Sequence, residues 1–130
     1  MPESTTLSVL INRNWHEVYE AIWRPEDFKK WASGLSKSAL TRTGDEWKAD
    51  GPAGPVTIEF TGHNEYGVMD HSVTLANGTV VYVPLRVIRN GADAEVLLTL
   101  QRQADMTDEQ YAADVEWVRH DLLALKGLFA

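Results

Sequence analysis

The C-terminal quarter of the sequence most constrains the fold, because it encodes one long helix with a single apolar face. The run "TDEQ" predicts a helix start in which Thr107 caps the backbone and Gln110 reaches back to it. Apolar residues then recur at alternating spacings of four and three, which places them on one stripe: Tyr111, Val115, Val118, Leu122, Leu125 and Phe129. A helix of about 22 residues is about 33 Å long, so it needs an apolar surface of similar length to cover.

The middle of the chain supplies that surface as a set of strands. From about residue 35 the apolar residues recur at period two, and short glycine-containing turns, "GPAGP" among them, separate the runs. The predicted antiparallel strands are "SALTRTGDEWKA" (two strands around Gly44), "VTIEFTG", "GVMDHSVTL", "TVVYVPLRVI" and "AEVLLTLQR". Before them, "TTLSVLI" predicts a first strand over 5–11. Asn12 or Asn14 then caps a short helix over 15–23, and Pro25 ends it and starts a second short helix.

The turn "LANGT" sets the register of the strand that carries His71. A two-residue Asn-Gly turn would point the following valines away from the apolar face of that strand. A three-residue turn, Ala76–Gly78, instead pairs Leu75 with Thr79 and places His71 opposite Val83. Because a one-residue slip moves every side chain to the other face, burial of the valines favours the three-residue turn. His71 is therefore expected on the inner face of the sheet.

Composition excludes several classes of protein. The 130 residues suit one domain, and we expect a single one over 1–130. The net charge of −7 argues against a surface for nucleic acid or anionic membranes. The chain has no cysteine, no basic start typical of a signal peptide and no apolar run long enough for a membrane span, so a cytoplasmic protein is expected.

The order strand, two short helices, six strands and long helix resembles the SRPBCC superfamily, the START-like or helix-grip fold of the birch-pollen allergens. Within it, the chain is most similar to small bacterial polyketide cyclase-like proteins. The resemblance rests on three segments: "VYEAIWRPEDFKKWASG" at 18–34, "NEYGVMDHSVTLANGTVVYVPLRV" at 64–87 and "MTDEQYAADVEWVRHDLLALKGL" at 106–128. It implies an α+β fold in which a curved antiparallel sheet of about seven strands wraps the long helix. It also implies a cavity between them for a hydrophobic ligand. Arg24 departs from the acidic residue that relatives often have before the proline.

His71 is the leading candidate for chemistry. In an apolar cavity a neutral imidazole can hydrogen-bond a ligand carbonyl or act as a general base. The alternative is a core histidine that bonds a backbone carbonyl or water. The residues expected to contact a ligand are Trp31, Trp47, Met69, His71, Val83, Leu85, Leu98, Val115, Val118 and Leu122. Large aromatic residues such as Trp31 and Trp47 are suited to the wide end of a gripped sheet, although an aromatic residue more often belongs to the core.

Other groups of polar residues in the sequence do not predict a catalytic or metal site. His63, Glu65, Asp70 and His71 together do not predict a metal site, because Asp70 and His71 point to opposite faces of one strand. Asp70 instead faces Arg86 on the outer surface, where we expect a surface ion pair. No serine stands in a nucleophile elbow and no phosphate-binding loop is present, and we expect neither a metal nor a cofactor.

Three functions remain open. The first is binding of a hydrophobic small molecule, aromatic, polyketide-like or lipid, with His71 as the polar anchor. The second is a polyketide cyclase or aromatase in which His71 is the acid or base. The third is a protein-interaction or co-chaperone module, which would need an exposed apolar patch and no cavity. For the oligomeric state we expect a monomer or a weak homodimer.

Overall fold

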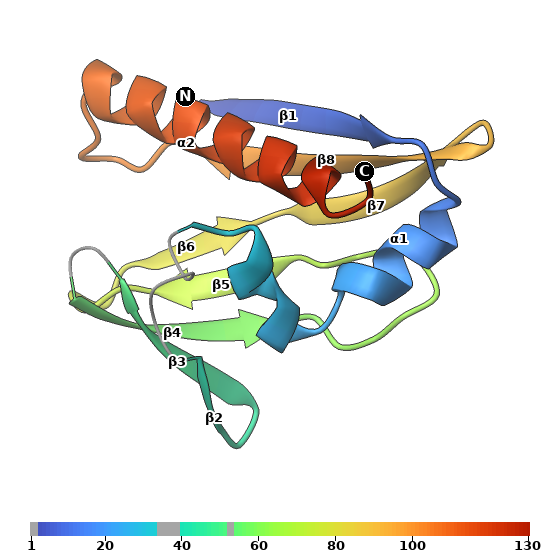
Figure 1. The fold of residues 1–130 in the computed structure, drawn as a ribbon. Coiled ribbons are helices and arrows are strands. Elements are labelled where there is room, and N and C mark those ends of the chain that lie inside the picture. Colours follow the sequence, from blue (N-terminus) through green and yellow to red (C-terminus); the bar gives the residue numbers. More distant parts are fainter. Residues whose placement is uncertain (1–2, 34–39, 52–53) are drawn as a thin grey trace.

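The computed structural model describes residues 3–33, 40–51 and 54–130, which form strands, two short helices and one long helix (Figure 1). The strands are β1 (Ser4–Ile11), β2 (Thr41–Thr43), β3 (Glu46–Gly51), β4 (Gly54–Phe60), β5 (His71–Thr74), β6 (Val80–Val83), β7 (Leu85–Asn90) and β8 (Asp93–Gln101). The helices are α1 (Trp15–Ile22), the 3₁₀ helix η1 (Pro25–Lys30) and α2 (Asp108–Gly127). Residues 38–39 of the first expected hairpin and 52–53 of the expected "GPAGP" turn lie outside the described residues. The α+β, helix-grip prediction is confirmed, with eight strands among the described residues.

The strands form two sheets that meet at Pro84. The small sheet has the order β1-β8-β7, and the large sheet has the order β2-β3-β4-β5-β6. "TVVYVPLRVI" was expected to be one strand, but Pro84 has no N–H to donate and divides it into β6 and β7. The chain stays connected across the division, because Thr99 N donates to Pro84 O and Met69 N donates to Leu85 O, at 3.0 and 2.8 Å.

The three-residue turn is confirmed. Leu75 N donates to Thr79 O at 2.8 Å, and Gly78 takes a φ of 89°, a left-handed conformation that glycine adopts without strain. His71 therefore pairs with Val83 in the β5–β6 ladder, as the apolar pattern predicts. The hydrogen-bonded strand is shorter than expected, because β5 begins at His71 and the two residues before Asp70 contact β7 instead.

Capping side chains fix where the two α-helices begin. Asn14 accepts hydrogen bonds from the backbone of α1, so it is the cap of the two candidates. Thr107 and Gln110 form the predicted capping box at the start of α2. The predicted stripe on α2 faces the core: Tyr111, Leu122 and Leu125 are buried, and Val115, Val118 and Phe129 pack partly buried against the same core.

Different helices cover the small sheet and the large sheet, which form the two ends of the molecule. α1 contacts β7 and β8, and α2 contacts β1 and β8, so helices cover the small sheet. The 3₁₀ helix η1 lies over the large sheet near β5, as Figure 1 shows. The side chain of Phe28 on η1 contacts the ring of His71 at 5.4 Å between ring centroids. Among the described helices, η1 is thus the one that covers the large sheet.

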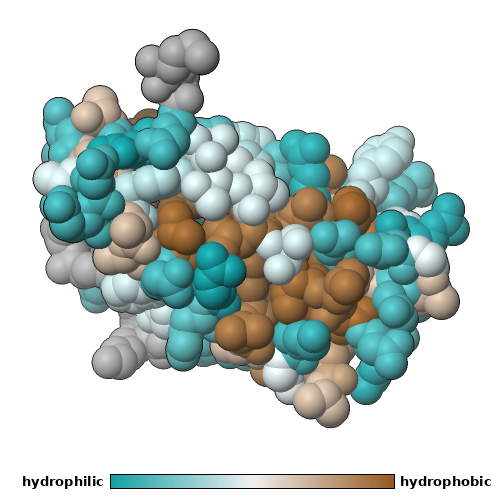
Figure 2. Space-filling model, turned by 90° about the horizontal axis from the view of Figure 1, so that it is seen from above, coloured by the Kyte–Doolittle hydropathy of each residue, from teal (hydrophilic) through white to brown (hydrophobic). Residues whose placement is uncertain are grey.

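The upper face, formed by α2 and β1, carries exposed apolar side chains. Figure 2 shows hydrophobic surface gathered over much of this face. Of the exposed large apolar residues, Trp117 and Leu123 lie on α2 and Leu128 is its C-cap residue. The sequence predicts no obvious apolar patch on the outer side of the long helix, which carries Glu116 and His120, and the exposed side chains of Trp117 and Leu123 correct this expectation. No helix among the described residues is long and apolar enough to cross a membrane.

Candidate functional site

An apolar cavity lies between η1, the large sheet and α2. Its volume is about 290 Å³, and we call it the inner cavity. It is lined by Phe28, Trp31, Ala32, Gly51, Val56, Ile58, Phe60, His71, Val73, Leu75, Leu98, Trp117 and Asp121. Most of these side chains are apolar, and the polar exceptions are His71, Asp121 and the indole N–H groups of the two tryptophans. Binding sites for small molecules typically have this composition.

His71 presents a hydrogen-bond acceptor to the inner cavity. Its Nδ1 lies 3.1 Å from the carbonyl oxygen of Met69, and because a carbonyl can only accept, Nδ1 carries the proton. In the neutral ring Nε2 then holds a lone pair, and it makes no hydrogen bond within the part of the chain that the structure describes. Burial lowers the pKa of His71 and outweighs the opposing effects of the Met69 bond and the Asp70 charge, so the ring is neutral at pH 7.

Trp31 adds a hydrogen-bond donor. Its side chain is 4% exposed, and its Nε1–H is buried without a hydrogen-bond partner among the described residues. An indole N–H can only donate, and an unpaired buried donor costs free energy of folding. Trp31 and His71 both contact the ring of Phe28, with centroid distances of 5.3 and 5.4 Å. Two residues that line the inner cavity thus carry an unpaired donor and an unpaired acceptor.

Asp121 ties the mouth of the inner cavity to α2. Its Oδ1 accepts hydrogen bonds from Ser33 Oγ at 2.7 Å and from Ser33 N at 3.3 Å. Ser33 lies just after η1, so this pair fixes the end of the short helix against the long one. We therefore assign Asp121 a positioning role.

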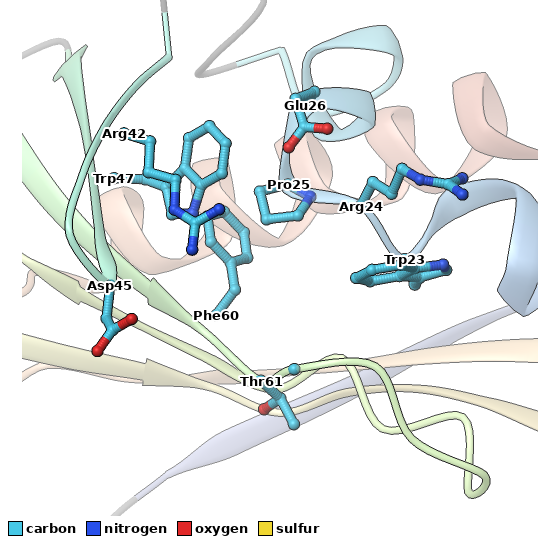
Figure 3. A pocket seen from close by; sticks show the side chains of 10 residues that line it. Trp23, Arg24, Pro25, Glu26, Arg42, Asp45, Trp47, Phe60 and Thr61 are labelled. Carbon is cyan, nitrogen blue, oxygen red and sulfur yellow. The ribbon is translucent and has the colours of Figure 1, made fainter.

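A second hollow lies on the other side of Phe60 and is shown in Figure 3. Its volume is about 530 Å³, and we call it the outer hollow. It is lined by Trp23, Arg24, Pro25, Glu26, Arg42, Asp45, Trp47, Phe60, Thr61 and Gly62. Phe60 lines both spaces, and its ring contacts Trp47 on one side and His71 on the other, at 6.4 and 5.5 Å between centroids. The outer hollow is more polar than the inner cavity because it holds four charged residues.

The residues expected to contact a ligand are distributed over three regions. Trp31, His71 and Leu98 line the inner cavity, and Trp47 lines the outer hollow. Met69, Leu85 and Leu122 are buried in the core, while Val83, Val115 and Val118 are partly buried and pack against it; none of these six lines the inner cavity. The inner cavity lies over the large sheet, whereas α1 packs on β7, where Leu85 is completely buried.

Several lining residues were not among the candidates. Phe60 ends the alternating run Val56, Ile58, Phe60, so the period-two pattern already placed all three on one face. Phe28 and Trp117 could not be assigned in this way, because their positions depend on how η1 and α2 dock. Phe28 is fully buried, and its ring packs edge-on against His71 at 87°.

The ion pair of Asp70 was expected at the surface, but Asp70 is buried. It does pair with Arg86, at 3.0 Å, but Asp70 is only 5% exposed. Its carboxylate also accepts hydrogen bonds from Tyr82 Oη at 2.6 Å and from Leu85 N at 2.8 Å. The break at Pro84 leaves the N–H of Leu85 without a ladder partner, and Asp70 replaces that partner. Burial would raise the pKa of Asp70, but these hydrogen bonds and the charge of Arg86 outweigh it and lower the pKa.

The histidine and acid residues considered as metal ligands lie apart. His63 pairs with Glu20, with 2.6 Å between Nε2 and Oε1, while Asp70 and His71 bond different partners. Across residues 3–33, 40–51 and 54–130, no group of three or more such side chains is arranged to hold a metal ion.

Searches against protein families and among curated proteins find no match to this sequence. Solved structures do match. An uncharacterised protein from Bacillus thuringiensis is 18% identical with a TM-score of 0.76, and the match covers 98% of each chain. A START superfamily protein from Mycobacterium smegmatis is 11% identical with a TM-score of 0.71, covering 97% of this chain and 96% of that one. Ara h 8.0201 is 9% identical with a TM-score of 0.67, covering 99% and 98%. The chain therefore has the helix-grip fold of START-like, SRPBCC proteins.

Proposed function

We propose that the protein binds a small apolar molecule carrying a hydroxyl group in the inner cavity. The observation that carries the proposal is a pair of unpaired polar groups on two residues that line this apolar space, the Nε2 lone pair of His71 and the Nε1–H of Trp31. A hydroxyl can donate to the first and accept from the second. A carbonyl ligand, in contrast, can use only Trp31 while Met69 holds the proton of His71 on Nδ1.

The volume narrows the ligand class further. About 290 Å³ lies at the lower end of the range for small-molecule sites, so a one- or two-ring aromatic compound fits better than an extended lipid. The aromatic rings of Phe28, Trp31 and Phe60 favour a flat guest, because stacked and edge-on ring contacts add to the gain from burial. The solved structures of START-like proteins with the same fold agree with hydrophobic ligand binding as a general function.

The proposal is tested by titrating 2-naphthol and naphthalene into the protein and measuring affinity by calorimetry. The hydroxyl should strengthen binding by about 1 kcal/mol, close to the net value of one hydrogen bond. His71→Phe keeps an aromatic ring but removes the acceptor, and it should bring the two affinities together. Trp117→Ala, which trims the cavity wall without touching the polar pair, should weaken both compounds alike. Failure of both compounds to bind the wild-type protein would overturn the proposal.

Affinity for 2-naphthol should also depend on pH through His71. Below its lowered pKa the ring is protonated on both nitrogens and no longer accepts a hydrogen bond. Binding should thus be constant above pH 6.5 and weaken at lower pH, as the protein passes through the folded-state pKa. The His71→Phe variant should lose this pH dependence, and a pH dependence that persists in that variant would contradict the role of His71.

A cyclase or aromatase activity is the second candidate function. A neutral imidazole with one nitrogen held by a carbonyl and the other free has the arrangement of a general base. If the protein is such an enzyme, His71→Ala should remove most turnover of a linear poly-β-ketone substrate while affinity changes by a few fold. A carrier would show no turnover in either form.

A further inference from the structure

The outer hollow adjoins the inner cavity at Phe60, which lines both spaces, and it contains a cationic group, Arg42. A row of ring contacts leads from His71 through Phe60 to Trp47, and the guanidinium of Arg42 lies 5.9 Å from the centroid of the Trp47 ring. Arg42 and Trp47 are cross-strand partners in the β2–β3 hairpin, so the hairpin itself holds the pair together. Each neighbouring pair along this row is thus in contact, from the inner cavity to Arg42.

Arg42 has no acidic partner among the residues that the structure describes. Its one hydrogen bond runs from Nε to the carbonyl oxygen of Gly44, at 2.9 Å, which orients the guanidinium and leaves its terminal nitrogens available. Four of the seven arginines in the sequence do form ion pairs with acidic side chains, namely Arg13, Arg86, Arg102 and Arg119. Among the described residues, Arg42 is thus one of three arginines without an ion pair, and it lines the outer hollow.

The outer hollow holds three other charged residues: Arg24, whose side chain points away from Arg42, and the acidic residues Glu26 and Asp45. Figure 3 shows Arg42 on the side of Trp47 and Phe60, whereas Arg24 extends the opposite way, and its guanidinium lies 5.2 Å from the Trp23 ring centroid. The carboxylates of Glu26 and Asp45 also line the hollow. They disfavour an anion near their own positions, so an anionic group is stabilised beside an arginine, and Arg42 is the arginine on the Phe60 side of the hollow.

We propose that the natural ligand is a hydroxyaryl acid, whose aromatic ring and hydroxyl occupy the inner cavity and whose carboxylate passes Phe60 to bind Arg42 in the outer hollow. This inference rests on the proposed function, because it extends the same ligand beyond the inner cavity. Arginine suits the task, since its planar guanidinium can donate two hydrogen bonds to one carboxylate. Trp47 stacked near Arg42 holds that plane in place.

The test uses 3-(6-hydroxynaphthalen-2-yl)propanoic acid and its neutral methyl ester, with 2-naphthol as the reference for the inner cavity. The wild-type protein should bind the acid about tenfold more tightly than the ester, despite a net charge of −7 that repels anions in general. Arg42→Met keeps an apolar side chain on Trp47 and should abolish this preference while leaving the affinity for 2-naphthol unchanged. Arg24→Met is the matched control, because it removes the same charge from the same hollow, and it should keep the preference.

The possible results separate the two proposals. If 2-naphthol binds but the acid and the ester bind equally, the extension to Arg42 is overturned and the inner-cavity proposal stands. If Arg24→Met reduces the preference as much as Arg42→Met, the effect is that of charge in general and the assignment of Arg42 is overturned. If 2-naphthol itself does not bind the wild-type protein, both proposals fail.

Discussion

The small sheet and the large sheet share the same alternating pattern of inward apolar residues. In the small sheet these residues pack in the core, and in the large sheet they line a cavity. Under α1 and the C-terminal half of α2, the residues Leu85, Val87 and Val96 are completely buried in a packed core. Under η1, the inward residues Val73 and Leu75 remain partly exposed and line a cavity. Both sets satisfy the period of a strand. What separates them is the covering element, because two helices close the small sheet and one six-residue 3₁₀ helix leaves space over the large one.

Truncating one leucine at each end should give the largest difference in stability. Leu85→Ala removes a fully buried side chain from the packed end and should cost about 3 kcal/mol of unfolding free energy. Leu75→Ala removes the same atoms from a side chain that already borders a cavity, and it should cost less than about 1 kcal/mol. Urea unfolding of the two variants measures both values. Equal costs would mean that the two ends are packed alike.

Asp70 stabilises the junction between the two ends and should give the next largest effect. Asp70→Asn removes the charge that Arg86 and Tyr82 bond and should cost about 2 kcal/mol at pH 7. Glu17→Gln is the control, because it breaks an exposed ion pair with Arg13 and should cost less than about 0.5 kcal/mol.

The contribution of Asp70 should also depend on pH. Its pKa is lower in the folded protein than in the unfolded chain, so the stabilisation is fully present above about pH 4 and is lost as the pH falls through the folded-state pKa. The wild-type and Asp70→Asn proteins should therefore converge in stability below pH 4. A constant difference between them down to the acid unfolding transition would contradict this assignment.

The smallest effect is expected from the two tryptophans with unpaired N–H groups. Trp31→Phe removes a buried donor without a partner, so stability should change by less than about 1 kcal/mol, because lost packing and relief of the unpaired group offset each other. It should nevertheless weaken 2-naphthol binding several fold. Trp23 has the same unpaired N–H but lines the outer hollow, so Trp23→Phe should leave 2-naphthol binding unchanged. Equal effects on binding would remove Trp31 from the site.

The sequence predicted the turn, the strand register and the helix start correctly, because residues close together in the chain determine each of them. The three-residue turn before Thr79 set the register that pairs His71 with Val83, and the capping box at Thr107 set the start of α2. The break at Pro84 was visible in the sequence as a residue without a backbone donor, yet the run around it read as one strand. The burial of Asp70 follows from that break, because a free N–H at Leu85 requires an acceptor.

The position of the cavity could not be predicted from these local sequence patterns. Leu85 and Leu75 both lie on inward faces of apolar strands, and only the docking of α1, η1 and α2 determines which of them meets a helix. The tautomer of His71 was equally hidden, since it depends on the carbonyl of Met69 lying 3.1 Å away. That contact is the one expected of a core histidine that bonds a backbone carbonyl, and it leaves Nε2 of the neutral ring as a hydrogen-bond acceptor.

The contrast between a packed end and a hollow end is tested most directly by nuclear Overhauser effects between 2-naphthol and the methyl groups of isotope-labelled protein. The account predicts contacts from the ligand to Val56, Ile58, Val73, Leu75 and Leu98, and none to Leu85, Val87 or Val96. Contacts to the second group, or contacts confined to the exposed leucines of α2, would contradict the account.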